Sequence, residues 1–238
     1  MIFTFLDREV FFARITVYQT NPKILMTSTL VPFLEEETID FSSDDHSIDF
    51  CDNRKHYNEI RKILLPLKQQ VLDKIRENLS LDKKKLNILK AAVPEILLYG
   101  TFERTFSTGL GLKLQEIAAV CGTSVINIDK AEGKVLGVDL RVLFGEGQMK
   151  AGTNTQTGTH KKDSIKKLLE TTDKNGTNPF FATALGESYE YVKDGILYIG
   201  GESFWEKIGV DYDTVYNTIV EVIVETYEEV KLINTTTV

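Results

Sequence analysis

The chain reads Gly137-Val138-Asp139-Leu140 and, a few residues later, Gln148-Met149-Lys150-Ala151-Gly152. The first stretch holds an acidic residue inside a β-type apolar run, and a lysine ends the short apolar run of the second. Residues i and i+2 of a strand point to the same face of a sheet, so Gln148 and Lys150 project together. If the two runs pair as a hairpin, Asp139 joins them on that side.

A carboxylate, a carboxamide oxygen and an ammonium would then converge. These are the fewest groups that magnesium-assisted hydrolysis of a phosphodiester needs. A charge such as Asp139 in mid-strand costs free energy unless a metal or a partner offsets it. Lys150 would lie near the attacking water and the phosphate, where it could lower the pKa of that water. The alternative is a solvent-facing hairpin whose polar residues have no role.

The spacing Asp139…Gln148-x-Lys150 resembles the core signature of the PD-(D/E)xK nuclease superfamily, in its Gln-x-Lys variant. With its flanking segments, the chain resembles type II restriction endonucleases over roughly residues 100–220. It departs from the superfamily in having glutamine where a glutamate is usual, and in its short hairpin. The flanks are Arg104-Thr-Phe-Ser-Thr-Gly-Leu-Gly111, Leu114-Gln-Glu-Ile-Ala118, Lys150-Ala-Gly-Thr-Asn-Thr155 and Gly200-Gly-Glu-Ser-Phe-Trp-Glu-Lys-Ile-Gly209.

The resemblance implies a Mg²⁺-dependent, sequence-specific endodeoxyribonuclease that leaves 5′-phosphates. It also implies a homodimer acting on double-stranded DNA, with a cognate DNA methyltransferase as its functional partner. The expected catalytic residues are Asp139, Gln148, Lys150 and a helical glutamate, Glu116. The expected metal ligands are Asp139, Gln148 and Glu146.

The assisting glutamate is left open by the sequence. Glu116 interrupts an apolar helical pattern, and it is equally well explained as a surface residue. Glu146 lies two residues before Gln148, on the same face of a regular strand, or it is an ordinary exposed turn residue. Glu103 and Arg104 are weaker alternatives.

A polar segment after Lys150 offers contacts for DNA phosphates. It is rich in hydroxyl groups, ends in basic residues and precedes a predicted helix, an arrangement that suits phosphate oxygens. A simple polar loop is the alternative. The predicted DNA-binding residues are Thr153, Asn154, Thr155, Thr157, His160, Lys161 and Lys162.

Charge is distributed unevenly along this acidic chain, whose net charge is −7. Residues 34–52 hold eight acids and no lysine or arginine, and residues 202–231 hold eight acids against two bases. Residues 54–90 hold eleven bases against four acids, and residues 150–167 hold five lysines against one acid. Such separation can create a positive face on an acidic protein, although 54–90 is equally typical of a solvated helix face.

The elements predict an α/β fold with a central mixed sheet flanked by helices, as in restriction endonucleases, with a helical N-terminal half and a C-terminal helix. One domain is expected over 1–238, with an unrecognised strand-plus-helical part at 1–100 and the nuclease core at 100–220. Apolar periodicity predicts strands at 9–19, 134–144 and 147–151, a hairpin at 189–199, and helices at 55–78, 82–92, 110–120, 163–171, 202–208 and 213–230.

Local signals refine these boundaries. Pro66 should kink or divide the first helix, and Pro94 should limit the second. Thr108 and Asp163 are expected N-caps. The turns are expected at 145–147 and at Asp194-Gly195. Phe204 and Trp205 are expected in the core.

The 238 residues suit a globular protein with 42% hydrophobic and 26% charged residues. No apolar run has membrane-spanning length, and the two cysteines, Cys51 and Cys121, do not form a disulfide framework, so a cytoplasmic protein is expected. Two other functions stay open: a repair or structure-specific nuclease of the same fold, and a non-catalytic DNA-binding module.

Overall fold

The computed structural model describes residues 47–81, 90, 93–133, 135, 137–152 and 158–236, with side chains for 53–81, 90, 93, 95–133, 135, 137–152 and 162–233. All of these residues belong to one compact unit, His46–Val238. The other unit, Met1–Asp45, lies outside the described residues, as do the strand predicted at 9–19 and most of the helix predicted at 82–92. The prediction of a single domain over 1–238 therefore stays a prediction.

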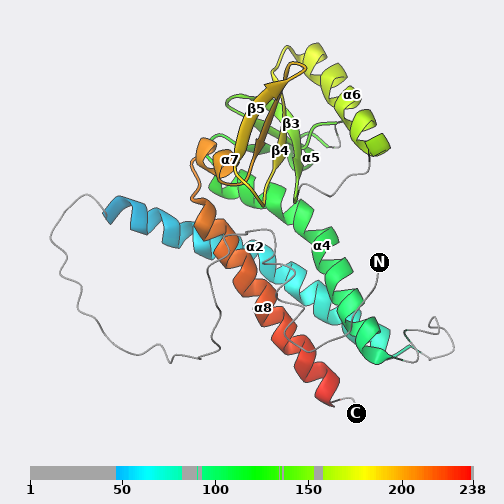
Figure 1. Cartoon of the computed structure of the whole chain (residues 1–238). Coiled ribbons are helices and arrows are strands. Elements are labelled where there is room, and N and C mark those ends of the chain that lie inside the picture. The colour runs from blue at the N-terminus through cyan, green and yellow to red at the C-terminus, as the bar shows by residue number, and fades with distance from the viewer. Residues whose placement is uncertain are drawn as a thin grey trace, which may run out of the picture. The chain divides into compact units, whose positions relative to one another are not determined.

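A mixed sheet of six strands occupies one end of this unit (Figure 1). Its order is β1-β2-β3-β4-β6-β5. The first three strands are antiparallel neighbours, β3, β4 and β6 run parallel, and β5 is antiparallel to β6. The strands are β1 (Ile126–Asn127), β2 (Leu140–Val142), β3 (Gly145–Lys150), β4 (Pro179–Thr183), β5 (Tyr189–Lys193) and β6 (Ile196–Gly200).

Helices flank the sheet and make up the N-terminal part of the described chain, so the predicted α/β class with a mixed sheet is confirmed. They are α2 (Ser47–Leu79), α4 (Pro94–Cys121), α5 (Ile128–Ala131), α6 (Gly158–Asn175), α7 (Glu202–Lys207) and α8 (Tyr212–Thr236). The predicted helices at 55–78, 202–208 and 213–230 are confirmed. The predicted division at Pro66 is wrong, because α2 continues through this residue, whose ring is exposed.

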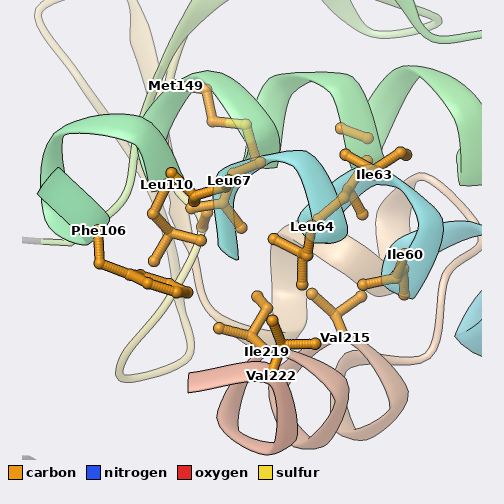
Figure 2. Close-up of a cluster of buried hydrophobic side chains, with 14 of the residues drawn as sticks. Ile60, Ile63, Leu64, Leu67, Phe106, Leu110, Met149, Val215, Ile219 and Val222 are labelled. Atoms are coloured by element: carbon orange, nitrogen blue, oxygen red, sulfur yellow. The ribbon is translucent and has the colours of Figure 1, made fainter. Parts of the chain in front are cut away.

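The main core lies between α2, α4, α8 and one face of the sheet (Figure 2). Spacing of three and four residues along α2 puts its apolar side chains on one stripe, which meets similar stripes on α4 and α8. Met149 reaches this core from β3. The residues labelled in Figure 2 are Ile60, Ile63, Leu64, Leu67, Phe106, Leu110, Met149, Val215, Ile219 and Val222.

Helix α4 is longer than predicted. It begins at Pro94, so Thr108 is an exposed residue in mid-helix and its predicted role as an N-cap is wrong. The apolar stripe continues upstream through Phe102 and Phe106. Gly109 lies inside this helix, where α2 and α4 approach closely. A Cβ at this position would lie 2.3 Å from Cδ1 of Leu67, so the close packing favours glycine.

Helix α6 also extends beyond its predicted bounds of 163–171. Asp163 is an exposed residue inside the helix, so its predicted role as the N-cap is wrong. The first turns of α6 are polar, and apolar periodicity therefore could not mark them. Their presence in the helix means that residues 158–162 are not part of a loop.

The hairpin between β2 and β3 is displaced from its predicted position. The turn is at Leu143 and Phe144, whereas Glu146 and Gly147 lie within β3. Gly147 is explained by packing, because a Cβ there would lie 2.2 Å from the Phe180 carbonyl oxygen on β4. Strand β2 is also shorter than the predicted 134–144, since the chain turns at Gly137, whose φ is +85°.

The C-terminal half agrees with expectation. Asp194 and Gly195 adopt the positive φ values of 52° and 77° that a tight hairpin turn needs. Phe204 and Trp205 are fully buried, and the indole Nε1–H of Trp205 donates to the Ala184 carbonyl oxygen at 2.7 Å. Along the described part of the chain, none of the helices is long and apolar enough to cross a membrane.

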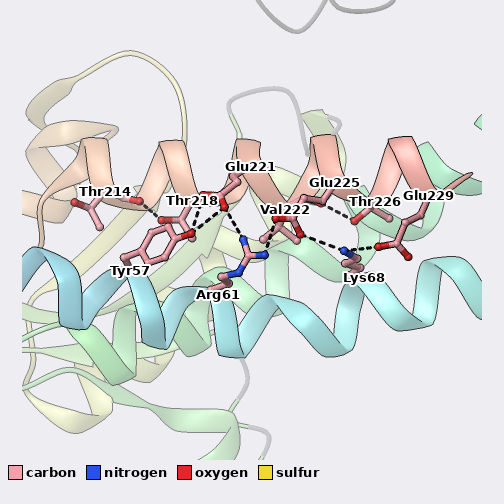
Figure 3. A network of polar contacts seen from close by, with 10 residues as sticks. All are labelled: Tyr57, Arg61, Lys68, Thr214, Thr218, Glu221, Val222, Glu225, Thr226 and Glu229. Atoms are coloured by element: carbon pink, nitrogen blue, oxygen red, sulfur yellow. Dashed lines mark hydrogen bonds and ion pairs between the residues drawn. The ribbon is translucent and has the colours of Figure 1, made fainter. Parts of the chain in front are cut away.

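The basic helix α2 and the acidic helix α8 meet along a seam of ion pairs (Figure 3). Arg61 contacts Glu221 at 2.7 Å and Glu225 at 2.5 Å. Lys68 contacts Glu225 at 3.1 Å and Glu229 at 2.7 Å. Part of the positive charge of residues 54–90 is therefore neutralised by α8, which weakens the case for a DNA-binding face on this helix.

Candidate active site

Asp139 lies just before β2 and is held from two sides. Its amide donates to the Gly147 carbonyl at 2.9 Å, and its own carbonyl accepts from the Ile128 amide at 3.0 Å. The carboxylate accepts a hydrogen bond at Oδ2 from the Met149 amide at 2.9 Å. The contacts of this carboxylate with the Met149 amide and with Lys150 both use Oδ2, so among the described residues Oδ1 is left for another ligand.

Lys150 ends β3 on the same side of the sheet. Its Nζ lies 3.8 Å from Oδ2 of Asp139, a long ion pair between two partly buried side chains. Burial raises the pKa of Asp139 above its ordinary value, while the Lys150 ammonium and the Met149 amide act in the opposite direction. A further cation beside this carboxylate would therefore stabilise its charged form.

Gln148 lies two residues before Lys150 in β3, which is flanked by β2 and β4. Only 6% of its surface is exposed, and its Oε1 is fully buried without a hydrogen-bond partner. Leaving a buried carbonyl oxygen unpaired costs about 1–3 kcal/mol. Such an atom requires an explanation, and a ligand that it coordinates is one.

Glu146 is buried two residues earlier on the same strand face, which the sequence left open. Its Oε1 accepts from Arg141 Nε at 2.6 Å, and its Oε2 accepts from Asn175 at 2.8 Å and Thr177 at 3.1 Å. Burial alone would raise the pKa of Glu146, but these hydrogen bonds outweigh it and hold the pKa below the ordinary value. The exposed-turn interpretation is wrong, and a role as metal ligand would require Glu146 to give up these partners.

Glu116 lies on α4 and is half-buried. Its carboxylate pairs with Lys113 at 3.0 Å and with Lys130 at 2.8 Å. Burial would raise the pKa of Glu116, but the two lysines hold it below its ordinary value. Neither of these contacts joins Glu116 to Asp139 or Lys150.

The predicted DNA-binding residues fall mostly at the limits of the structure. Thr153, Asn154, Thr155 and Thr157 lie outside the described residues. His160 and Lys161 lie in the first turns of α6, where only the backbone is described, and Lys162 follows with an exposed side chain. The side chain of Lys162 is therefore available to solvent.

Sequence patterns missed two hydroxyl-bearing residues that the strand order brings beside Lys150. Thr183 is its register partner on β4, and Tyr189 on β5 bonds to Thr183. No local spacing could have found them, because they follow Lys150 by more than thirty residues and are separated from it by α6.

Two oxygen atoms could serve as protein ligands of a cation: Oδ1 of Asp139, whose observed contacts use Oδ2, and the unpartnered Oε1 of Gln148. Among the residues that the structure describes, no three or more His, Cys, Asp or Glu side chains gather to hold a metal. Magnesium nevertheless fits a set of one or two protein oxygens, because it keeps several waters and takes substrate phosphate oxygens as ligands. The buried, unpartnered Gln148 oxygen is the observation that favours this fit.

Comparison with known proteins gives no match: no family model, no curated protein and no solved structure is significantly similar to the chain.

Proposed function

We propose that the chain is a magnesium-dependent endodeoxyribonuclease of the type II restriction kind, with a restriction-endonuclease-like fold. The observation that carries the proposal is the buried, unpartnered Oε1 of Gln148 on the strand that also bears Lys150. The ion pair between Lys150 and Asp139 supports it by bringing an ammonium and a carboxylate to the same side. Cytoplasmic location remains part of the proposal.

Asp139 and Gln148 would hold the ion through Oδ1 and Oε1. Bound there, magnesium would polarise the phosphate and favour ionisation of the attacking water. Lys150 lies next to Asp139 and carries the charge that offsets the negative charge developing on the phosphate. The Met149 amide fixes the Asp139 carboxylate through Oδ2 and leaves the other oxygen free to bind.

Glu146 would act in this scheme as a support. It anchors Arg141, which lies opposite it on β2 and bonds onward to Glu132 at 2.6 Å. This network ties together both strands of the site hairpin. Glu116 has no place among the reacting groups unless it exchanges its two lysine partners.

The substrate in this proposal is double-stranded DNA, cut to leave 5′-phosphates. A homodimer follows from the two-fold symmetry of a palindromic site, since matching symmetry lets one interface serve both strands. A cognate DNA methyltransferase would protect the same sites on the host DNA. Lys161 and Lys162 would contribute phosphate contacts from the start of α6.

A second candidate is a DNA-binding module without cleavage. The observation that favours it is the neutral Gln148 in place of a carboxylate, which leaves Asp139 as the one charged member of the donor set. A structure-specific nuclease of the same fold would cut without a defined sequence, because it reads shape and backbone.

One digestion separates these candidates. A long natural DNA is incubated with the protein in Mg²⁺ or in EDTA, and the ends of the fragments are sequenced. A single recurrent end sequence in Mg²⁺ supports a restriction endonuclease, and ends without a common sequence support the structure-specific nuclease.

The site assignment is tested with Asp139→Ala, which should abolish cleavage but leave DNA binding. Asp173→Ala, at an exposed position on α6, is the matched control. An intact DNA with wild-type protein in Mg²⁺ supports the non-catalytic module and contradicts the proposal.

A further inference from the structure

The three parallel strands of the sheet end in one row. Lys150 is the last residue of β3, Thr183 the last of β4 and Gly200 the last of β6, and these residues are register partners. Tyr189, the first residue of the antiparallel strand β5, pairs with Gly200 and completes the row. The carboxyl ends of parallel strands are where open α/β sheets bind their ligands.

Gly200 is what lets Tyr189 reach across the row. A Cβ on Gly200 would lie 2.3 Å from Cε1 of Tyr189, so the ring occupies the space of the missing side chain. The tyrosine hydroxyl thereby passes over β6 and lies 2.6 Å from Oγ1 of Thr183 on β4. Thr183 is 4% exposed, so this hydroxyl pair is sheltered and well defined.

The pair has one hydrogen-bond donor to spare. Two hydroxyl groups carry two protons, and the bond between them uses one. Within the described part of the chain, no acceptor is observed for the other proton. Burial raises the pKa of Tyr189 above its ordinary value, so its hydroxyl remains a donor at neutral pH.

The neighbouring strand supplies the charge that suits an anionic acceptor. Lys150 stands next to Thr183 in the row, and register partners on adjacent strands project from the same face. An oxygen anion held by the Lys150 ammonium would therefore lie on the side of the sheet where the spare hydroxyl proton is presented. Hydrogen bonds to charged groups are stronger than neutral ones.

We propose that Tyr189 donates its hydroxyl proton to a non-bridging oxygen of a DNA backbone phosphate beside Lys150, and that Thr183 is the positioning residue, which donates its own hydroxyl proton to the Tyr189 oxygen and so orients the tyrosine. This inference rests on the proposed nuclease function and adds a substrate contact to it. The competing explanation is a purely structural bond that ties β5 to β4.

The first experiment compares Tyr189→Phe with Tyr191→Phe in plasmid cleavage with Mg²⁺, with the melting temperature of each variant measured in parallel. Tyr191 lies two residues further along β5, stacked on Tyr198 and half exposed. We expect Tyr189→Phe to lower kcat/KM about ten-fold or more, the loss of one hydrogen bond to a charged group, and Tyr191→Phe to stay within about two-fold.

The threonine is tested in the same assay. Thr183→Val removes the hydroxyl with little change of shape and should reproduce the loss, whereas Thr183→Ser should restore most of the activity. If Tyr189→Phe melts at a lower temperature but cleaves like the wild type, the bond is structural and the inference is wrong. Wild-type protein that fails to cut overturns the proposed function and this inference together.

The second experiment uses the cleavage site found by fragment-end sequencing and does not depend on stability. Single methylphosphonates replace the phosphates around that site one at a time, removing one charged oxygen each. At one position the substitution should impair Tyr189→Phe clearly less than the wild type, because the variant has already lost one of the two contacts, to Tyr189 and to Lys150, that this phosphate makes. Losses that combine independently at every position would show that Tyr189 touches none of these phosphates.

Discussion

Replacing Gln148 with leucine should stabilise the protein and abolish its activity. Leucine has similar bulk, so the packing between β2 and β4 is kept, but it has no oxygen to leave unpaired. A residue that is kept for metal coordination can lower the stability of the fold, so replacing it can raise the free energy of unfolding. Opposite effects on stability and cleavage would therefore isolate the functional reason for Gln148.

The size of the effect follows from the burial of one atom. Oε1 of Gln148 has no solvent contact and no partner, and such a carbonyl oxygen costs about 1–3 kcal/mol. We take the lower end, about 1 kcal/mol, because whatever the amide nitrogen contributes is lost as well. For a domain of this size that is a rise in melting temperature of about 2–4 °C.

The measurement is thermal unfolding by circular dichroism in EDTA, together with plasmid cleavage in Mg²⁺. Gln148→Glu should keep measurable cleavage, since it supplies an oxygen at the same position. Gln115→Leu is the control, because Gln115 is buried to a similar degree, at 7%, but its oxygen is not among the buried unpartnered atoms of the described chain. A Gln148→Leu variant that melts well below the wild type, or cuts like it, would refute the reasoning.

Three further predictions concern other parts of the chain. Lys161→Ala with Lys162→Ala should reduce the slope of log K for DNA binding against log salt concentration by the amount expected for about two phosphate contacts. An unchanged slope in binding titrations would show that these lysines do not contact the DNA. The hydrogen bond from Arg61 lowers the pKa of Glu225, so Glu225→Gln should lower the melting temperature at neutral pH. The difference between variant and wild type should disappear as the pH falls through that lowered pKa. Gly147→Ala should lower the free energy of unfolding in urea by about 1–3 kcal/mol through overpacking. Gly111 lies in α4, and a Cβ there would meet no atom within 4 Å, so Gly111→Ala should raise the free energy of unfolding by up to about 1 kcal/mol.

Elements whose signals are local were predicted correctly. The β5–β6 hairpin follows from Asp194-Gly195, whose backbone conformation is set within the turn itself. Helix α2 follows from the spacing of its apolar residues, which one stripe on the core explains. In both cases the physics that fixes the element acts between residues close in sequence.

Boundaries that depend on distant neighbours were predicted wrongly. Gly147 resembles a turn residue, but its small size is required by Phe180 on β4. Thr108 resembles a helix cap, but it lies on the solvent face of a helix whose other face is fixed by α2. Nothing within a window of a few residues distinguishes these cases.

The candidate site divides in the same way. Asp139 and Lys150 belong to the entry and the end of one hairpin, so the ion pair between them could be predicted from strand periodicity, whereas metal binding by Gln148 stays a prediction. Tyr189 depends on the strand order β4-β6-β5 and on a glycine in the strand between, which sequence periodicity does not encode. Glu146 was expected in a turn because the position of the hairpin was predicted too late in the sequence.

Trp205 gives the protein a built-in optical reporter. It is the sole tryptophan of the chain, fully buried, and its indole is anchored to the carbonyl of Ala184, the residue after Thr183. Its emission should therefore be blue-shifted and should come from one environment. Any movement of the segment at the end of β4 changes that environment, so fluorescence can follow events beside Lys150 in real time without an added label.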